Sequence, residues 1–350
     1  MITDAQSPQF ASDNNAGICP EALAAIAEAN RGHAPGYGAD AWTRAAHDAI
    51  RAAFETDCDV YLVFNGTAAN SLALASICRS TDAIICSENA HVNVDECGAP
   101  EFFSGGAKVV TTPTPQAKLV PAQVAALGAP AHDEHGSRPR ALALTQATEF
   151  GTVYTANELR ALCEAAHARG MKVQLDGARF ANAVASLACA PADISWRAGV
   201  DVLCLGGTKN GLPFGEAIVF FDRALADEFL RRRKQGGQLA SKMRYLAAPW
   251  SALMAEGVWL KHAAHANAMA RRLAAAIEKL PGVELIAPVE ANGVFVDLPA
   301  TVSEVVRAKG WRFYNFVGGT GVRFMCAWDT PPDRVDRFAS DIAHAIASRN

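Results

Sequence analysis

The sequence contains a short apolar run that ends abruptly in glycines and a lysine, Leu203-Cys204-Leu205-Gly206-Gly207-Thr208-Lys209-Asn210-Gly211. An earlier stretch has the same form and ends in an acid and an arginine, Val173-Gln174-Leu175-Asp176-Gly177-Ala178-Arg179. Such runs are typical of buried strands that are followed by loops. Because the carboxyl ends of parallel strands meet at one edge of a sheet, we expect Asp176, Arg179 and Lys209 to lie close together.

A lysine beside an acid and an arginine is the combination that a pyridoxal phosphate (PLP) enzyme requires. Lys209 is predicted to form the Schiff base, and Asp176 to keep the pyridine nitrogen of the cofactor protonated. Burial after its strand would lower the pKa of Lys209 and make the free amine available. Two alternatives stay open: Lys209 is a solvated surface residue, or Asp176 caps a helix and is neutralised by Arg179.

Other polar residues are predicted to face the same edge of the sheet. Gly66 and Thr67 follow a strand and open a helix, so their backbone N–H groups form a phosphate cradle or, alternatively, an ordinary helix cap. His91 follows another strand, and its imidazole can stack on the pyridine ring or serve as an ordinary polar residue. Arg323 lies among apolar neighbours and requires an anion, which is either a substrate carboxylate or a structural ion-pair partner.

A basic run, Arg231-Arg232-Arg233-Lys234, is interpreted as a solvated helix face. Lys242 and Arg244 lie just beyond it and are candidates for contacting the phosphate, also across a subunit interface. The pairs His132/His135 and His262/His265 have metal-like spacing, but no supporting cysteines or acids accompany them, so no metal is expected.

The composition is that of an ordinary globular protein. Half of the 350 residues are hydrophobic, 19% are charged, and the net charge of −4 gives no reason to expect a nucleic acid or a membrane as partner. The start of the chain lacks a basic segment before an apolar one, and no apolar run approaches the length of a membrane helix. Nine cysteines without a Cys-x-x-Cys pair indicate a reducing, cytoplasmic setting.

The hydrophobic pattern divides the chain near residue 250. From about residue 60 strands alternate with helices, which predicts an α/β large domain, residues 1–250, with a mostly parallel sheet flanked by helices. Residues 241–280 are predicted to be largely helical, with Pro249 and Gly257 as breakers. Short alternating strands and a final helix follow, which predicts a smaller C-terminal α+β domain, residues 251–350.

With these residues in view, the chain resembles the L-threonine aldolases of the low-specificity type. These are PLP-dependent enzymes of the aspartate-aminotransferase-like fold, which is the PLP-dependent transferase fold of type I. The likeness runs from Ser12 to about Cys326. It rests on Ser12-Asp13-Asn14, Tyr37-Gly38-Ala39-Asp40, Asn65-Gly66-Thr67-Ala68-Ala69-Asn70, Ala90-His91, Asp176-Gly177-Ala178-Arg179 and Gly207-Thr208-Lys209-Asn210-Gly211.

The resemblance implies a role for each matching residue. Lys209 would bind the cofactor covalently, Asp176 would contact its pyridine nitrogen, and Arg179 would help to hold the ring or the substrate. The phosphate would lie on Gly66 and Thr67, with His91 stacked on the ring, and Ser12 and Arg323 would bind the substrate carboxylate. Members are homotetramers, dimers of dimers with active sites at the dimer interface, so Tyr37 and Lys242 or Arg244 are expected to serve the neighbouring site.

The sequence departs from the family pattern at two positions. Many members read Thr-His-Asn-Gly where this chain has Thr148-Glu149-Phe150-Gly151, and many have an aromatic residue at the position of Asp95. Both positions belong to the region that would hold the β-hydroxyl group. The base is therefore left open among His91, Asp95, Glu149 and an ordered water.

The activity implied by the resemblance is reversible retro-aldol cleavage of an L-β-hydroxy-α-amino acid to glycine and an aldehyde. L-Threonine, L-allo-threonine and phenylserine are the candidate substrates. The alternatives are β-elimination or transamination on the same scaffold, and a non-catalytic PLP-fold binding protein. An intact Lys209 argues against a pure binder.

Overall fold

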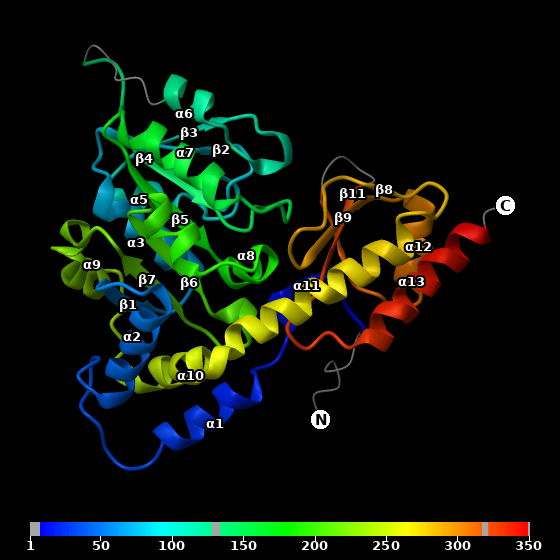
Figure 1. Ribbon diagram of the computed structural model, residues 1–350, viewed down its shortest axis with the longest axis horizontal. Coiled ribbons are helices and arrows are strands. Elements are labelled where there is room, and N and C mark those ends of the chain that lie inside the picture. Colours follow the sequence, from blue (N-terminus) through cyan, green and yellow to red (C-terminus); the bar gives the residue numbers. More distant parts are fainter. Residues whose placement is uncertain (1–7, 128–133, 317–320, 349–350) are drawn as a thin grey trace.

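The computed structural model describes residues 8–127, 134–316 and 321–348. Its elements form two lobes, each built around one sheet, and helix α11 (Val258–Ile277) runs from one lobe to the other (Figure 1). The large lobe surrounds the large sheet, and the small lobe contains the C-terminal strands and helices. The position of a domain boundary at residue 250 stays a prediction.

The large sheet has the strand order β1-β7-β6-β5-β4-β2-β3 in the described part of the chain. Its strands are β1 (Asp59–Val63), β2 (Asp82–Ser87), β3 (Lys108–Thr112), β4 (Arg138–Thr145), β5 (Lys172–Gly177), β6 (Val202–Gly206) and β7 (Glu216–Phe220). All run in the same direction except β7, which is antiparallel to both of its neighbours. The connection from β6 to β7 contains only a short 3-10 turn, η5 (Thr208–Asn210), and a connection without a crossover helix reverses the chain.

Helices cover both faces of the large sheet, as expected of an α/β fold. They are α1 (Pro20–Ala29), α2 (Ala41–Phe54), α3 (Gly66–Ile77), α4 (His91–Val94), α5 (Ala99–Ser104), α6 (Pro121–Leu127), α7 (Ala156–His167), α8 (Phe180–Leu187), α9 (Phe229–Gln235) and α10 (Arg244–Met254). Alternate strand residues enter different cores: Leu203 and Leu205 lie in one cluster, and Val202 and Cys204 lie in the other. This two-sided burial explains the continuous apolar run of β6.

The small lobe contains an antiparallel sheet with the order β10-β11-β9-β8. Its elements are β8 (Glu284–Leu285), β9 (Gly293–Asp297), β10 (Tyr314–Asn315), β11 (Gly321–Met325), α12 (Ala300–Ala308) and α13 (Pro332–Ala347). The N-terminal segment also belongs to this core, because buried Phe10 stacks on Phe338 with ring centroids 4.6 Å apart. Residues 8–10 are thereby attached to the small lobe.

The segment from 241 to 280, predicted as largely helical, is two helices. α10 ends at Met254 and α11 begins at Val258, and the turn η7 (Ala255–Gly257) separates them. Glu256 and Gly257 both have positive φ there, 51° and 69°, which ends the first helix. None of the described helices combines the length and the hydropathy of a membrane-spanning segment.

Candidate active site

Two adjoining cavities lie at the carboxyl ends of β5 and β6 and at the start of α3. The first, of about 230 Å³, is lined by Lys209, Asp176, His91, Gly66 and Thr67 among others. The second, of about 460 Å³, is lined by Ser12, Asp95, Glu149, Arg179 and Arg323 among others, and it shares Lys209 and His91 with the first. The structure therefore brings these predicted residues together in one place.

Lys209 enters the site on η5, directly after β6. The turn passes so close to β5 that a Cβ atom on Gly206 would lie 2.5 Å from the carbonyl oxygen of Ala178, which explains the glycine. Burial, together with the nearby guanidinium of Arg179, lowers the pKa of Lys209. Lys209 is half-buried and lines both cavities, so it is not an exposed surface residue. Within the described residues no hydrogen-bond acceptor contacts its Nζ, which leaves the amine available to a ligand.

Asp176 ends β5 and is held from two sides. Its Oδ2 accepts a hydrogen bond from Asn70 Nδ2 at 2.7 Å, and its Oδ1 accepts one from the backbone N–H of Ala178 at 2.9 Å. Arg179 does not neutralise it, because Nε and Nη2 of that arginine donate to both oxygens of Asp13 at 2.7 and 2.9 Å. The alternative of an Asp176–Arg179 pair is thus replaced by a buried Asp13–Arg179 pair.

The start of α3 presents backbone donors to the first cavity. Asn65 caps the helix by accepting a hydrogen bond from the N–H of Ala68 at 2.9 Å, and its carbonyl accepts from Ala69. In the described structure the N–H groups of Gly66 and Thr67 have no acceptor, and a Cβ atom on Gly66 would meet open space. The N-terminal end of a helix dipole then faces the cavity, which is an arrangement that favours an anion such as phosphate.

Glu149 lies in the wall of the second cavity, at the end of β4. Its Oε1 accepts hydrogen bonds from Thr145 Oγ1 at 2.8 Å and from the backbone N–H of His91 at 3.0 Å. Its Oε2 is buried and has no partner among the described residues, and burial raises the pKa of this carboxyl to about 7. Asp95 lines the same cavity but is exposed.

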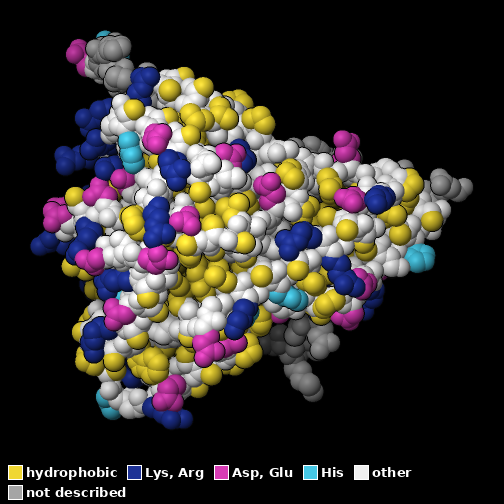
Figure 2. Space-filling model, in the orientation of Figure 1, with side chains coloured by type: hydrophobic (Ala, Val, Ile, Leu, Met, Phe, Trp, Pro, Cys, Tyr) yellow, Lys and Arg dark blue, Asp and Glu magenta, His cyan; other side chains and the backbone are white. Residues whose placement is uncertain are grey.

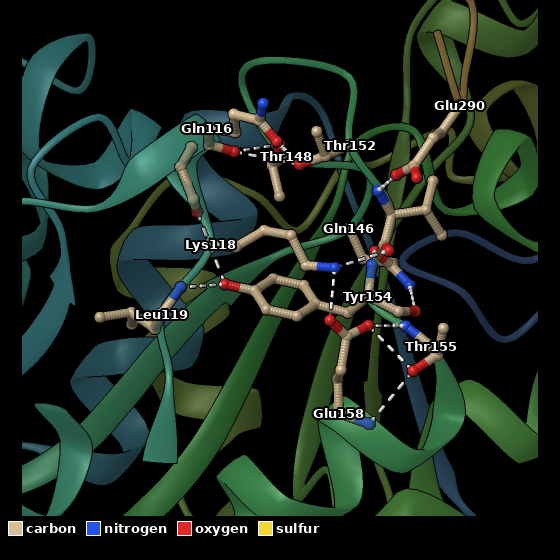
Figure 3. A network of polar contacts seen from close by, with 12 residues as sticks. Gln116, Lys118, Leu119, Gln146, Thr148, Thr152, Tyr154, Thr155, Glu158 and Glu290 are labelled. Atoms are coloured by element: carbon tan, nitrogen blue, oxygen red, sulfur yellow. Dashed lines mark hydrogen bonds and ion pairs between the residues drawn. The ribbon is translucent and has the colours of Figure 1, made fainter. Parts of the chain in front are cut away.

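The loop that carries Glu149 is held by a polar network (Figure 3). Gln146 and Tyr154 exchange two hydrogen bonds, of 2.8 and 3.0 Å, across the loop. Glu290 of the small lobe accepts a hydrogen bond from the N–H of Val153 at 2.6 Å. The position of Glu149 therefore depends on contacts with both lobes.

Arg323 reaches the second cavity from β11 of the small lobe. Its Nε is buried without a partner, and Nη2 makes only a 3.4 Å contact with the carbonyl oxygen of Ala11. No carboxylate among the described residues pairs with it, so the structural ion pair considered as its alternative is not found there. Ser12, which is buried, lies in the same wall and accepts a hydrogen bond from the N–H of Asn14 at 3.1 Å.

Comparison with known proteins gives the family. Residues 9–301 match the model of the family described as beta-eliminating lyase. The chain is 55% identical over 347 residues to a low specificity L-threonine aldolase from Pseudomonas sp. (strain NCIMB 10558), covering 99% of this chain and 100% of that protein. The chain belongs to the low-specificity L-threonine aldolase family. A second member, from Pseudomonas aeruginosa, is 57% identical over 341 residues, which cover 97% of this chain and 98% of that protein.

Solved structures agree with this assignment. A threonine aldolase from Leishmania major superposes with a TM-score of 0.91 at 29% identity, covering 97% of this chain and 99% of that one. Oryza sativa TDC with PLP and tryptamine superposes with a TM-score of 0.79 at 15% identity, covering 100% of this chain and 85% of that one, which shows the shared fold alone. The predicted PLP-dependent transferase-like fold is thereby confirmed.

Three residues that the threonine aldolase resemblance placed at a neighbouring site lie outside both cavities of this chain. Tyr37 is exposed, with Lys234 Nζ 5.3 Å from its ring centroid. Arg244 donates to the carbonyl oxygen of Gly32 at 3.2 Å, and Lys242 lines a separate cavity of about 660 Å³. Their proposed contacts to another subunit stay predictions.

The two histidine pairs with metal-like spacing, His132/His135 and His262/His265, do not change the assignment of the site residues. His132 lies outside the described residues. His265 Nε2 lies 2.7 Å from the carbonyl oxygen of Thr330, and His262 stacks on Trp328 at a centroid distance of 5.0 Å.

Sequence reasoning missed four buried polar residues at the site: Asp13, Asn70, Glu96 and Glu216. Glu96 contacts His91, and Glu216 accepts a hydrogen bond from the N–H of Gly207 at 2.8 Å, with burial raising its pKa to about 7. Asp13 and Asn70 lie inside stretches that carry the resemblance, which was a usable signal. Glu96 and Glu216 have no local pattern that distinguishes them from surface acids.

Proposed function

We propose that this chain cleaves L-threonine and related L-β-hydroxy-α-amino acids reversibly to glycine and an aldehyde. The observation that carries the proposal is the shared cavity wall. Lys209, Asp176 and the start of α3 lie on one side of it, and the unpaired Arg323 lies on the other. This arrangement supports a cofactor site directly beside a site for a carboxylate.

The residues of the first cavity fit PLP. Lys209 has a free, depressed-pKa amine that would hold the cofactor, and the open N–H groups of Gly66 and Thr67 would hold its phosphate. Asp176 is fixed where it would face the pyridine nitrogen, and His91 would cover the ring. When bound, PLP supplies the electron sink that accepts the electron pair of the broken Cα–Cβ bond.

In the second cavity the chain's own side chains orient the substrate. The guanidinium of Arg323 would bind the α-carboxylate, since it cannot lose its proton and lacks a carboxylate partner in the described structure. Ser12 would donate its hydroxyl hydrogen to the same carboxylate, and Arg179, fixed by Asp13, would border the ring. Holding one end of the substrate in this way sets the angle of the bond that breaks.

The β-hydroxyl proton needs an acceptor near the mouth of the second cavity. His91, Asp95 and Glu149 all line that cavity. Among the described residues the buried Oε2 of Glu149 has no partner, and the pKa of this carboxyl is raised to about 7, so Glu149 stays a candidate beside His91. Asp95 is exposed to solvent. Because positions 95 and 149 both depart from the family pattern, we expect them to influence the preference between threo and erythro substrates.

We also propose how this protein assembles and where it is located. We expect a homotetramer, a dimer of dimers, located in the cytoplasm, in which Tyr37, Lys242 and Arg244 face the neighbouring site. Exposed Phe64 stacks on Phe214 beside the phosphate cradle, which supports an interface there. Figure 2 shows further hydrophobic side chains gathered on the visible face of the large lobe.

A substrate panel tests the proposal. The purified, PLP-loaded protein is incubated with L-threonine, L-allo-threonine and L-phenylserine, and glycine, aldehyde, ammonia and 2-oxo acids are quantified. We expect equal amounts of glycine and aldehyde. Ammonia with a 2-oxo acid as the main products would contradict it and would favour β-elimination, while an aminated acceptor would favour transamination.

A further inference from the structure

A chain of hydrogen bonds runs behind the first cavity, from His91 to β5. His91 Nδ1 lies 2.8 Å from Glu96 Oε1, and Asn70 Nδ2 donates to the same oxygen at 3.1 Å. Asn70 Nδ2 also donates to Asp176 Oδ2 at 2.7 Å. The Glu96 side chain is fully buried, and Asn70 is 2% exposed.

The orientation of the Asn70 amide is fixed by its neighbours. Its Nδ2 group has two hydrogens, and each points to one carboxylate. Its Oδ1 accepts a hydrogen bond from Gln174 Nε2 at 3.0 Å. A flipped amide would place its oxygen against two carboxylates, so the observed orientation is the one in which Asn70 can donate to both of them.

The contact with Glu96 also fixes the tautomer of His91. A carboxylate oxygen only accepts, so Nδ1 carries the hydrogen and Nε2 keeps its lone pair in the neutral ring. No described residue makes a hydrogen bond to Nε2, and the His91 side chain is 40% exposed at the two cavities. Nε2 is therefore free to accept a proton from a bound molecule.

Several charged groups act on the His91 ring. The hydrogen bond that His91 donates to Glu96 raises the pKa of His91, opposed by burial, and Asp176 on β5 adds to the rise. Lys209 on η5 lowers it, while Glu149 binds the backbone N–H of His91 and Asp95 ends the same helix. Burial acts to raise the pKa of Glu96, yet hydrogen bonds from His91, Thr67 and Asn70 hold it below its usual range.

We propose that Glu96 and Asn70 are positioning residues of this site. Glu96 orients His91 so that Nε2 accepts the substrate's β-hydroxyl proton, and Asn70 joins Glu96 to Asp176 so that both carboxylates keep their places. The assignment of the proton step rests on the proposed function. The positions of His91 and Asp176 depend only on the hydrogen bonds of the cluster and not on which reaction the protein catalyses.

The direct test is Glu96→Gln, with Glu101→Gln as a matched control from the neighbouring helix α5. We expect Glu96→Gln to lower kcat for L-threonine about 10- to 100-fold with little change in KM. Loss of the negative charge lowers the pKa of His91, so the acid limb of kcat/KM moves about one unit to lower pH. An unchanged pH profile with normal kcat would overturn the role of Glu96.

A second readout does not involve turnover. The absorbance of the bound cofactor is titrated with pH in Glu96→Gln, Asn70→Ser and Glu101→Gln, and PLP affinity is measured from fluorescence quenching of the apoprotein. We expect the absorbance midpoint to fall in Glu96→Gln, and PLP to bind about tenfold more weakly in Asn70→Ser. Titrations identical to that of Glu101→Gln would contradict the proposal, even for a protein that failed to cleave L-threonine.

Discussion

Arg179 and Arg323 both line the second cavity, and they differ in whether a carboxylate of the chain pairs with them. Arg179 is saturated by the two oxygens of Asp13, and although burial acts to raise the pKa of Asp13, this arginine holds it below its usual value. Arg323 has no such partner in the described chain, and burial and the proximity of Arg179 lower its pKa. A guanidinium that stays charged without a carboxylate requires a bound anion, so we expect Arg323, rather than Arg179, to bind the substrate carboxylate.

The change Arg323→Gln tests this assignment. A charge-assisted contact is worth about 1.5–3 kcal/mol, so we expect kcat/KM for L-threonine to fall about 10- to 100-fold. The absorbance of the bound cofactor is expected to stay normal, because Arg323 lines only the second cavity. Arg312→Gln removes an exposed arginine of the same lobe and serves as the control. Equal steady-state kinetics for the two variants would refute the role of Arg323 in binding the substrate carboxylate.

The sequence predicted those site residues that belong to a recognisable local motif. Lys209 and Asp176 follow apolar strands, and their meeting follows from parallel pairing. The partners Asp13 and Glu96 come from separate segments, and only the folded chain brings them to Arg179 and His91. A buried carboxylate and a surface one look alike in sequence, because their difference lies in long-range packing.

Among the elements, the turn from β6 into η5 determines where Lys209 lies. A Cβ atom on Gly206 would approach Ala178 to 2.5 Å, and one on Gly207 would approach Leu212 to 2.5 Å and Trp250 to 2.7 Å. Gly206 lets the end of β6 pack directly on the loop after β5, and Gly207 lets the turn pack on Leu212 and Trp250. The parallel pairing of β5 with β6 brings Asp176 and Lys209 to the same edge of the sheet.

Replacement of Gly206 by alanine is therefore expected to disturb both stability and the cofactor site. We expect a loss of ~1–3 kcal/mol in the free energy of unfolding, the usual range for overpacking, and weaker PLP binding. Gly17→Ala is the control, since a Cβ atom there meets nothing within 4 Å. Urea unfolding of the apoproteins measures the difference, and equal midpoints for the two variants would be evidence against the close packing.

The elements were largely predictable, with two informative exceptions. β7 lies in the region where strands were predicted to alternate with helices, but its antiparallel direction depends on the short connection from β6. Gly257, predicted as a breaker, does lie at the break between α10 and α11, whereas Pro249, the other predicted breaker, lies inside α10 and does not end it. Periodicity identifies a strand or a helix, whereas direction and interruptions are decided by connections.

For the whole molecule, the site is assembled from both lobes. Asp13 of the N-terminal segment bonds Arg179 of the large lobe and accepts a hydrogen bond from Asn292 of the small lobe at 3.0 Å. Arg323 comes from β11, and Lys209 from the loop after β6. The distance between the cofactor residues and the carboxylate handle is therefore set by the packing of one lobe on the other.

The covalent role of Lys209 is tested most directly by locating the bond between the cofactor and the protein. The PLP-loaded protein is reduced with borohydride, which makes the bond between cofactor and lysine permanent, and peptide mass spectrometry finds the modified residue. We expect a pyridoxyl group on Lys209 of the wild-type protein and no labelled peptide from Lys209→Ala. A label on another lysine such as Lys242, or a wild-type protein that takes up no label, would contradict it.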